Sequence, residues 1–215
     1  MKKYLLYAAA VFALGLSACV RDRGPQPDYP QHYSFVEEFD NNRNRWSFDD
    51  PDNYAWGDVG GGTFLMNYDD DLSIAYYIAK DIPGVNYQDD FTIYSRIGSN
   101  NNMGLLFGYN IATNSYGYSF MIDYDGYYAL YDEGGNGYGP DIEELVPPQT
   151  NNYVNINGDW NDLKLEQRGN RWVGYINDVQ VFNIPAQHIK GRSAGFVLMP
   201  FTEGEADYLQ VDWIR

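Results

Sequence analysis

The 215-residue chain has a single cysteine, Cys19, and only two histidines, His32 and His188. A lone cysteine cannot form a disulfide within the chain, so stability has to come from packing and hydrogen bonds. His32 lies before the first expected strand, which leaves His188 alone in the body of the chain. A Ser-His-Asp triad and a multi-histidine zinc site are therefore not indicated.

Basic residues are also few, with 14 Lys and Arg against 30 Asp and Glu, and the formal net charge is −16. Such a chain repels phosphates, which argues against nucleic acid as a partner. The same charge argues against electrostatic adhesion to anionic lipid. The longest apolar run, residues 4–16, is too short to cross the roughly 30 Å of hydrocarbon in a bilayer.

The N-terminus instead predicts export. Lys2 and Lys3 precede the apolar run, which ends at Leu16-Ser17-Ala18-Cys19. These four residues resemble the lipobox of bacterial lipoproteins, which implies a signal peptide over residues 1–18 and an acylated Cys19. The alternative is an ordinary signal peptide that contains a cysteine.

Residues 19–32 contain three prolines and predict an extended tether. The membrane is then a partner only through the lipid anchor. Val20, rather than an aspartate, follows the cysteine, which favours the outer membrane of the cell envelope.

The rest of the chain, residues 33–215, predicts a single all-β domain, because short alternating runs are bounded by Gly, Asn and Asp. About a dozen strands in one domain favour two packed antiparallel sheets. Two-residue turns are expected at Asp125-Gly126 and Asn177-Asp178, and another turn at Glu203-Gly204. Residues 146–152 are expected to form a loop, and residues 141–145 are weakly helix-like. Strands are expected at 33–39, 63–68, 73–79, 90–97, 104–109, 116–124, 127–132, 161–167, 171–176, 179–184, 194–200 and 207–214.

Four segments carry a family resemblance. WNDLKLEQRGNRWVGYINDVQVF (160–182) has a Trp that opens a strand, alternating aliphatics and two turns, and it resembles concanavalin A-like jelly rolls of the laminin G type. FVEEFDNNRNRW (35–46), residues 103–132 and residues 194–215 resemble the opening, central and closing strands of such domains. The resemblance implies a two-sheet antiparallel β-sandwich. Proteins with such jelly rolls include lectins, glycan-binding modules, glycoside hydrolases and exported proteins similar to 3-keto-disaccharide hydrolases, so the resemblance does not fix the function.

Catalytic acids are not evident in the sequence. Retaining glycoside hydrolases need two carboxylates about 5 Å apart, and the E-x-D-x-x-E string of concanavalin A-like glucanases is absent. We interpret the close acid groups as solvated or turn-forming side chains, so no catalytic residue is predicted. These groups are Glu37-Glu38, Asp123 with Asp125, Glu143-Glu144, and Glu203, Glu205 and Asp207.

Aromatic residues point to sugar binding instead, because flat rings can stack on the C–H face of a sugar while Asp and Asn bind its hydroxyls. The chain has 21 Tyr and 5 Trp. With a two-residue turn at Asp125-Gly126, strand alternation predicts one aromatic face and one mixed face on the hairpin. The paired residues would be Tyr124 with Tyr127, Ile122 with Ala129, and Phe120 with Tyr131. Tyr128, Asp123 and Asp132 would stand on the mixed face, which is the candidate binding surface if the aromatic face is core. The candidate ligand-binding residues are Tyr128, Asp123, Asp132, Tyr131 and Tyr118.

The sequence thus predicts an envelope-anchored lipoprotein whose sandwich binds a glycan. Two alternatives stay open: a glycoside hydrolase of the same fold, and a protein-interaction or structural domain of the envelope. No cofactor is required, although structural calcium is an option at the oxygen-rich segments 49–53 and 69–71. Neither segment has a D-x-D-x-D-G loop, and exposed turns explain both compositions.

Overall fold

The computed structural model describes residues 30–71, 74–113, 117–134 and 142–215. Residues Gln31–Arg215 form one compact unit. The predicted signal peptide, Cys19 and most of the tether lie outside the described residues. Within the described residues, no helix is long and apolar enough to cross a membrane.

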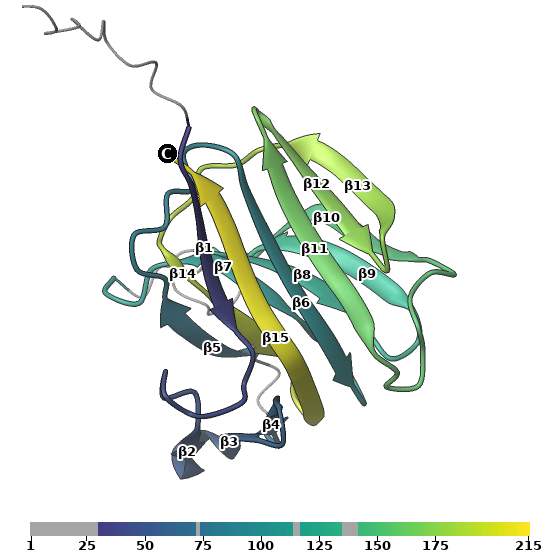
Figure 1. Ribbon diagram of the computed structural model, residues 1–215. Coiled ribbons are helices and arrows are strands. Elements are labelled where there is room, and N and C mark those ends of the chain that lie inside the picture. The colour runs from purple at the N-terminus through teal and green to yellow at the C-terminus, as the bar shows by residue number, and fades with distance from the viewer. Residues whose placement is uncertain (1–29, 72–73, 114–116, 135–141) are drawn as a thin grey trace, which may run out of the picture. The chain divides into compact units, whose positions relative to one another are not determined.

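Two antiparallel sheets stack on each other in a β-sandwich of jelly-roll type, as the sequence predicts (Figure 1). The larger sheet has the order β13-β12-β11-β6-β15-β4-β3-β2, with β1 paired to β15. Its strands are β1 (His32–Glu37), β2 (Phe48–Asp50), β3 (Ala55–Gly60), β4 (Thr63–Tyr68), β6 (Phe91–Ser99), β11 (Asn161–Arg168), β12 (Arg171–Ile176), β13 (Val179–Pro185) and β15 (Thr202–Ile214), and the short helix η1 (Pro51–Asn53) follows β2.

The smaller sheet has six strands in the order β10-β9-β8-β7-β14-β5. Its strands are β5 (Tyr76–Asp81), β7 (Met103–Tyr109), β8 (Tyr118–Ile122), β9 (Tyr127–Asp132), β10 (Glu143–Thr150) and β14 (Ser193–Leu198). Every pairing in both sheets is antiparallel, so alternate residues of each strand face the core.

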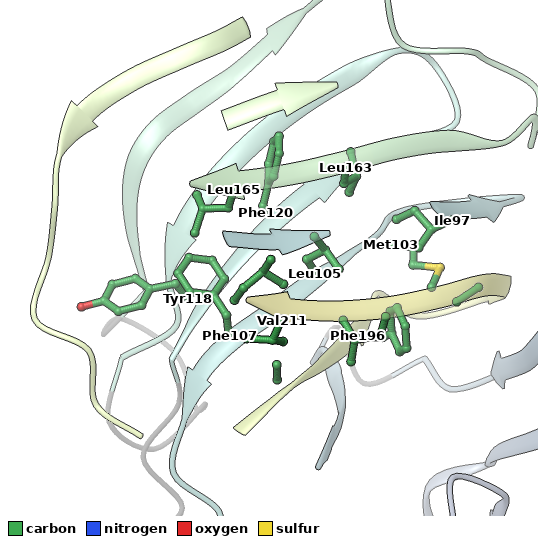
Figure 2. Packing of buried hydrophobic residues seen from close by; sticks show 14 of the residues in the cluster. Ile97, Met103, Leu105, Phe107, Tyr118, Phe120, Leu163, Leu165, Phe196 and Val211 are labelled. Carbon is green, nitrogen blue, oxygen red and sulfur yellow. The ribbon is translucent and has the colours of Figure 1, made fainter. Parts of the chain in front are cut away.

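The core fills the space between the two sheets. Leu163 and Leu165 of the larger sheet and Leu105 and Phe120 of the smaller one are at most 1% exposed and point into the same layer (Figure 2). At one end of the core, the rings of Phe39, Trp46, Phe64 and Phe196 lie within 5.3–6.2 Å of one another. Packed aromatic contacts of this kind stabilise a core that has no disulfide.

Glu37 fixes the entry of the chain into the sandwich. Its carboxylate is 6% exposed and accepts hydrogen bonds from the Phe39 amide, the Asn44 side chain at 2.6 Å and the Trp46 indole at 2.9 Å. A buried carboxylate is tolerated only when its oxygens have donors, and these three supply them. The opening segment 35–46, FVEEFDNNRNRW, therefore has a structural role.

The Asn177-Asp178 turn is confirmed. Both residues have positive φ, at 49° and 65°, and Ile176 pairs with Val179 across the turn. These are the dihedral angles of a two-residue hairpin turn, which Asn and Asp adopt at low cost. The Asn177 side chain also donates to Asn161, a 2% exposed residue at the start of β11.

The predicted register of the β8–β9 hairpin is wrong by one residue. Ile122 pairs with Tyr128 and Phe120 with Leu130. The Asp123 amide donates to the Tyr127 carbonyl at 3.0 Å, so the loop has three residues and ends at Gly126, whose φ is 90°. A slip of one residue moves every side chain of a strand to the other face of the sheet.

Two further expectations are also wrong. Glu203-Gly204 is not a turn, because β15 runs through both residues while pairing with β4 and β6. Residues 143–150 form strand β10, in place of a helix-like segment and a loop. Pro147 and Pro148 suggest a loop from sequence, but β10 is an edge strand with irregular register, where proline is tolerated. The short strands β2 and β3 are absent from the prediction.

Replacing Glu37 tests its structural role. We expect Glu37→Ala to lower the free energy of unfolding by about 2–4 kcal/mol, because the buried Trp46 indole and the Phe39 amide lose their acceptor. Urea unfolding followed by tryptophan fluorescence measures the change. Glu38→Ala removes the same charge from an exposed neighbour and should change stability by less than about 0.5 kcal/mol. Equal effects of the two substitutions would contradict the role assigned to Glu37.

Candidate functional site

The outer face of the six-stranded sheet carries a groove of about 590 Å³. Alternation sends Phe196, Leu105 and Phe120 into the core, and their neighbours Val197, Gly104 and Met121 to the outer face. The groove is lined by Ile74, Ala75, Tyr77, Asn102, Met121, Ile122, Asp123, Tyr127, Tyr128, Ala129, Tyr131, Glu133, Ile142, Pro148, Val197 and Met199. Its volume lies within the usual range of small-ligand sites, about 300–1,000 Å³.

Gly104 lets the groove floor lie flat. A Cβ at this position would sit 2.3 Å from the Phe120 carbonyl oxygen and 2.7 Å from the Met121 sulfur. The Met121 side chain therefore covers the backbone of β7, and the side chain itself is 7% exposed. The floor is apolar because Val197 and Ala129 flank it.

A hydrogen-bonded bridge joins β5 to the end of β9. The Tyr77 hydroxyl donates to Oε2 of Glu133 at 2.7 Å, and the Ser119 hydroxyl donates to Oε1 of the same carboxylate. Glu133 is 4% exposed and Ser119 is fully buried. The Tyr77 ring stacks on Tyr109 with 8° between the ring planes. These contacts hold the Glu133 carboxylate in a fixed position at the groove.

Tyr131 lies among carboxylates. Partial burial raises the pKa of its hydroxyl, and the nearby charges of Glu144, Glu133 and Asp123 raise it further. Glu144 pairs with Tyr131 across the β9–β10 ladder, so both side chains stand on the outer face. The Tyr131 hydroxyl is therefore a hydrogen-bond donor at neutral pH, and the raised pKa extends this state to higher pH than for an ordinary tyrosine.

Asp123 has a structural role in the hairpin loop. Its Oδ1 accepts hydrogen bonds from the amides of Asp125 at 2.9 Å and Tyr127 at 2.8 Å. The same residue lines the groove, next to the 42% exposed ring of Tyr127. The loop that Asp123 closes therefore positions Tyr127 at the groove rim.

The five predicted ligand-binding residues separate into two groups. Asp123 and Tyr131 lie at the groove, on the outer face of the sheet. The side chains of Tyr128, Tyr118 and Asp132 lie on the core-facing side of the sheet, although Tyr128 also borders the groove. The one-residue difference in register accounts for Tyr128 and Asp132 on β9, whereas Tyr118 shares the core face with Phe120 in either register. The expectation that Tyr128 and Asp132 face outward on the mixed face is therefore wrong.

The hydrogen bonds of these inward side chains explain their position. The Tyr128 hydroxyl donates to the Val181 carbonyl at 2.9 Å, and the Tyr118 hydroxyl donates to the His188 carbonyl at 2.7 Å. Both rings belong to the core cluster. Asp132 forms an ion pair with Lys190.

Tyr77, Met121 and Glu133 are groove residues that the sequence reasoning missed. Glu133 follows the expected strand 127–132 and was assigned to no element, and Tyr77 was expected in a strand for which no pairing was predicted. The alternation of Met121 with the buried Phe120 and Ile122 is visible in the sequence, and it identifies Met121 as outward-facing once the core face is known.

The remaining acid groups do not build a second site. Glu203 and Glu205 point outward from the nine-stranded sheet, because the residues that alternate with them, Thr202, Gly204 and Ala206, are buried. No group of three or more His, Cys, Asp or Glu side chains that could hold a metal ion occurs among the described residues.

In segment 49–53, Asp50 accepts hydrogen bonds from the Asn53 side chain and the Tyr76 hydroxyl, and these two contacts lower the pKa of its carboxyl.

No family model and no curated protein sequence matches the chain. Solved structures do match. A GlcNAcα1-4Gal-releasing endo-β-galactosidase from Clostridium perfringens has a TM-score of 0.51 at 9% identity, over 87% of this chain and 64% of that one. The carbohydrate-binding module CBM66 from Bacillus subtilis has a TM-score of 0.44 at 14% identity, over 72% and 81% of the two chains. Sheep galectin-11 has a TM-score of 0.42 at 8% identity, over 62% and 99%. At these identities the likeness concerns the fold alone.

The Tyr77–Glu133 bridge predicts a measurable stability effect. We expect Tyr77→Phe to lower the free energy of unfolding by about 1–3 kcal/mol, because a buried carboxylate loses one of its two hydroxyl donors. Tyr127→Phe removes a hydroxyl from an exposed ring on the same face and should change stability by less than about 0.5 kcal/mol. Thermal unfolding of both variants makes the comparison, and unchanged stability of Tyr77→Phe would contradict the bridge.

Proposed function

We propose that the sandwich binds carbohydrate in the groove of the six-stranded sheet. The observation that carries the proposal is the combination of a flat apolar floor with tyrosine rings and fixed oxygen acceptors in one cavity. Tyr131 and Tyr127 offer faces for the C–H side of a sugar ring. Glu133, Asp123 and Asn102 offer oxygens to its hydroxyl groups.

Binding is favoured over hydrolysis by the state of the groove carboxylates. Both oxygens of Glu133 already accept a hydroxyl donor, and Oδ1 of Asp123 accepts two loop amides. A carboxylate with about four acceptor sites can still take a sugar hydroxyl. These contacts use both carboxylates as acceptors for hydrogen bonds that hold the fold together, which favours a binding role over an acid–base role.

The third sequence-based reading, a protein-interaction or structural domain, predicts a flat face without a groove. A groove of about 590 Å³ favours a small-molecule or oligosaccharide ligand instead. The endo-β-galactosidase with the similar fold is named for a glycan substrate. That name makes glycans the first ligand class to test on this chain.

We also propose that acylation of Cys19 attaches the chain to the outer membrane of the cell envelope. The support is the lipobox-like sequence Leu16–Cys19 after the charged and apolar N-terminal segment. With a net charge of −16, the chain needs a covalent lipid to stay at an anionic membrane surface. Residues 20–32 would then separate the sandwich from the bilayer.

Tyr131→Ala tests the sugar-binding proposal. We expect the affinity for a bound glycan to fall by about 2 kcal/mol, or roughly thirtyfold, because a stacking ring at the centre of the site is removed. Glycan-array screening of the full chain in detergent, followed by calorimetry on the glycans that bind, measures the loss. Tyr124→Ala is the matched control, since Tyr124 is 41% exposed in the hairpin loop and is not a groove residue. Equal losses in the two variants, or no binding to any glycan, would refute the proposal.

Cys19→Ser tests the anchor. We expect the wild-type chain to sediment with membranes and to incorporate labelled palmitate, and the variant to do neither, because serine offers no thiol for acylation. Cell fractionation and fluorography give the two readouts. A membrane-bound, unlabelled wild-type chain would show that something other than Cys19 acylation holds it there.

A further inference from the structure

The described residues that line the groove include acidic side chains and no basic ones. Asp123 and Glu133 line it, while no Lys, Arg or His side chain is among its described lining residues. Glu144 adds a third carboxylate beside Tyr131.

Three basic groups on or beside the sheet bind elsewhere. Lys80 of β5 donates to the Arg45 carbonyl at 2.7 Å and lies 5.7 Å from the centre of the Trp46 ring. Lys190 pairs with Asp132 and lies 5.1 Å from the centre of the Tyr118 ring, on the core-facing side of β8 and β9. Arg192 pairs with Asp81 at 3.1 Å. None of the three is a lining residue of the groove.

Burial strengthens the effect of these charges. Glu133 is 4% exposed, and the apolar floor of Met121, Val197 and Ala129 lies beside it. A like charge brought into such a site is repelled more strongly than it would be in water, because the surrounding medium polarises less than water does. An anionic ligand would also lose hydration without gaining a cationic partner.

We propose that the groove selects glycans by charge: it accepts neutral sugars and amino sugars, and it excludes uronic, sialic and sulfated sugars. The inference rests on the proposed function and adds the ligand class to it. A protonated amino group can bind the free acceptor sites of Glu133 and Asp123, whereas a carboxylate or sulfate meets only repulsion. Amino sugars should therefore bind more tightly than their N-acetylated counterparts.

An array of neutral, amino, uronic, sialylated and sulfated glycans, probed with the full chain in detergent, provides the test. We expect binding only to neutral and amino glycans, with an affinity at least about tenfold lower for a counterpart that differs by one carboxylate. Binding of acidic glycans with equal affinity would overturn the inference and leave the proposed function intact. Absence of binding to every glycan would overturn both.

Charge reversal on β10 supplies a matched pair of variants. Glu143 and Glu144 are both exposed, but Glu144 pairs with Tyr131 and Glu143 with Asp132, so their side chains stand on opposite sides of the sheet. We expect Glu144→Lys to raise the affinity for the carboxylated counterpart by about tenfold, and Glu143→Lys to leave it unchanged. Equal responses of the two variants would overturn the inference.

The dependence of glycan affinity on salt concentration is a second test, because a steric explanation of the selection predicts no such dependence. Raising the ionic strength from about 0.01 M to 1 M shortens the screening length from about 30 Å to about 3 Å. We expect this change to weaken binding of amino glycans and to leave binding of neutral glycans constant. Amino-glycan affinity that does not change with salt would contradict the electrostatic origin of the selection.

Discussion

The carboxylate of Asp123 determines which side chains of β9 face the groove. By accepting the amides of Asp125 and Tyr127, it closes a three-residue loop between β8 and β9. That loop sets the register, and the register places Tyr127 and Tyr131 on the outer face and Tyr128 in the core. With a two-residue turn, the opposite set of β9 side chains would line the groove.

Glu37 and Glu133 are two buried carboxylates with the same kind of hydrogen-bond partners. Glu37 and Glu133 are each less than 7% exposed, and each accepts at least two hydrogen bonds from neutral donors. Neutral donors leave the negative charge in place, whereas a lysine or arginine would cancel it. At Glu37 the result is a fixed chain entry, and at Glu133 it is a negatively charged wall of the groove.

The sequence predicts the fold well because strand alternation and turn chemistry are local properties. The Asn177-Asp178 turn and the strands at 63–68, 127–132 and 171–176 follow from neighbouring residues alone. The candidate site is predicted only in part. Asp125-Gly126 fits a two-residue or a three-residue loop equally well, and the choice depends on a hydrogen bond from the Asp123 side chain, which the residue pattern does not reveal.

Tyr77 and Glu133 show a second limit of sequence reasoning. They are 56 positions apart, on β5 and at the end of β9, and the order of the six-stranded sheet places three strands between β5 and β9. No local pattern therefore indicates their contact. Pairings between distant strands are a tertiary property. Similarly, the prolines of β10 are compatible with a strand because β10 lies at the sheet edge, and its edge position is set by the order of the whole sheet.

Strand β15 has a consequence for how the sandwich assembles. Along one side its first residues pair with β4 and its last residues with β1, while β6 pairs along its other side. Figure 1 shows it in the middle of the larger sheet, between elements far apart in the chain. Until β15 docks, β6-β11-β12-β13 and β4-β3-β2 are two unconnected ribbons with open edges. The larger sheet therefore closes in a late step with large sequence separation, which predicts slow folding and makes the unfinished chain prone to edge-to-edge aggregation.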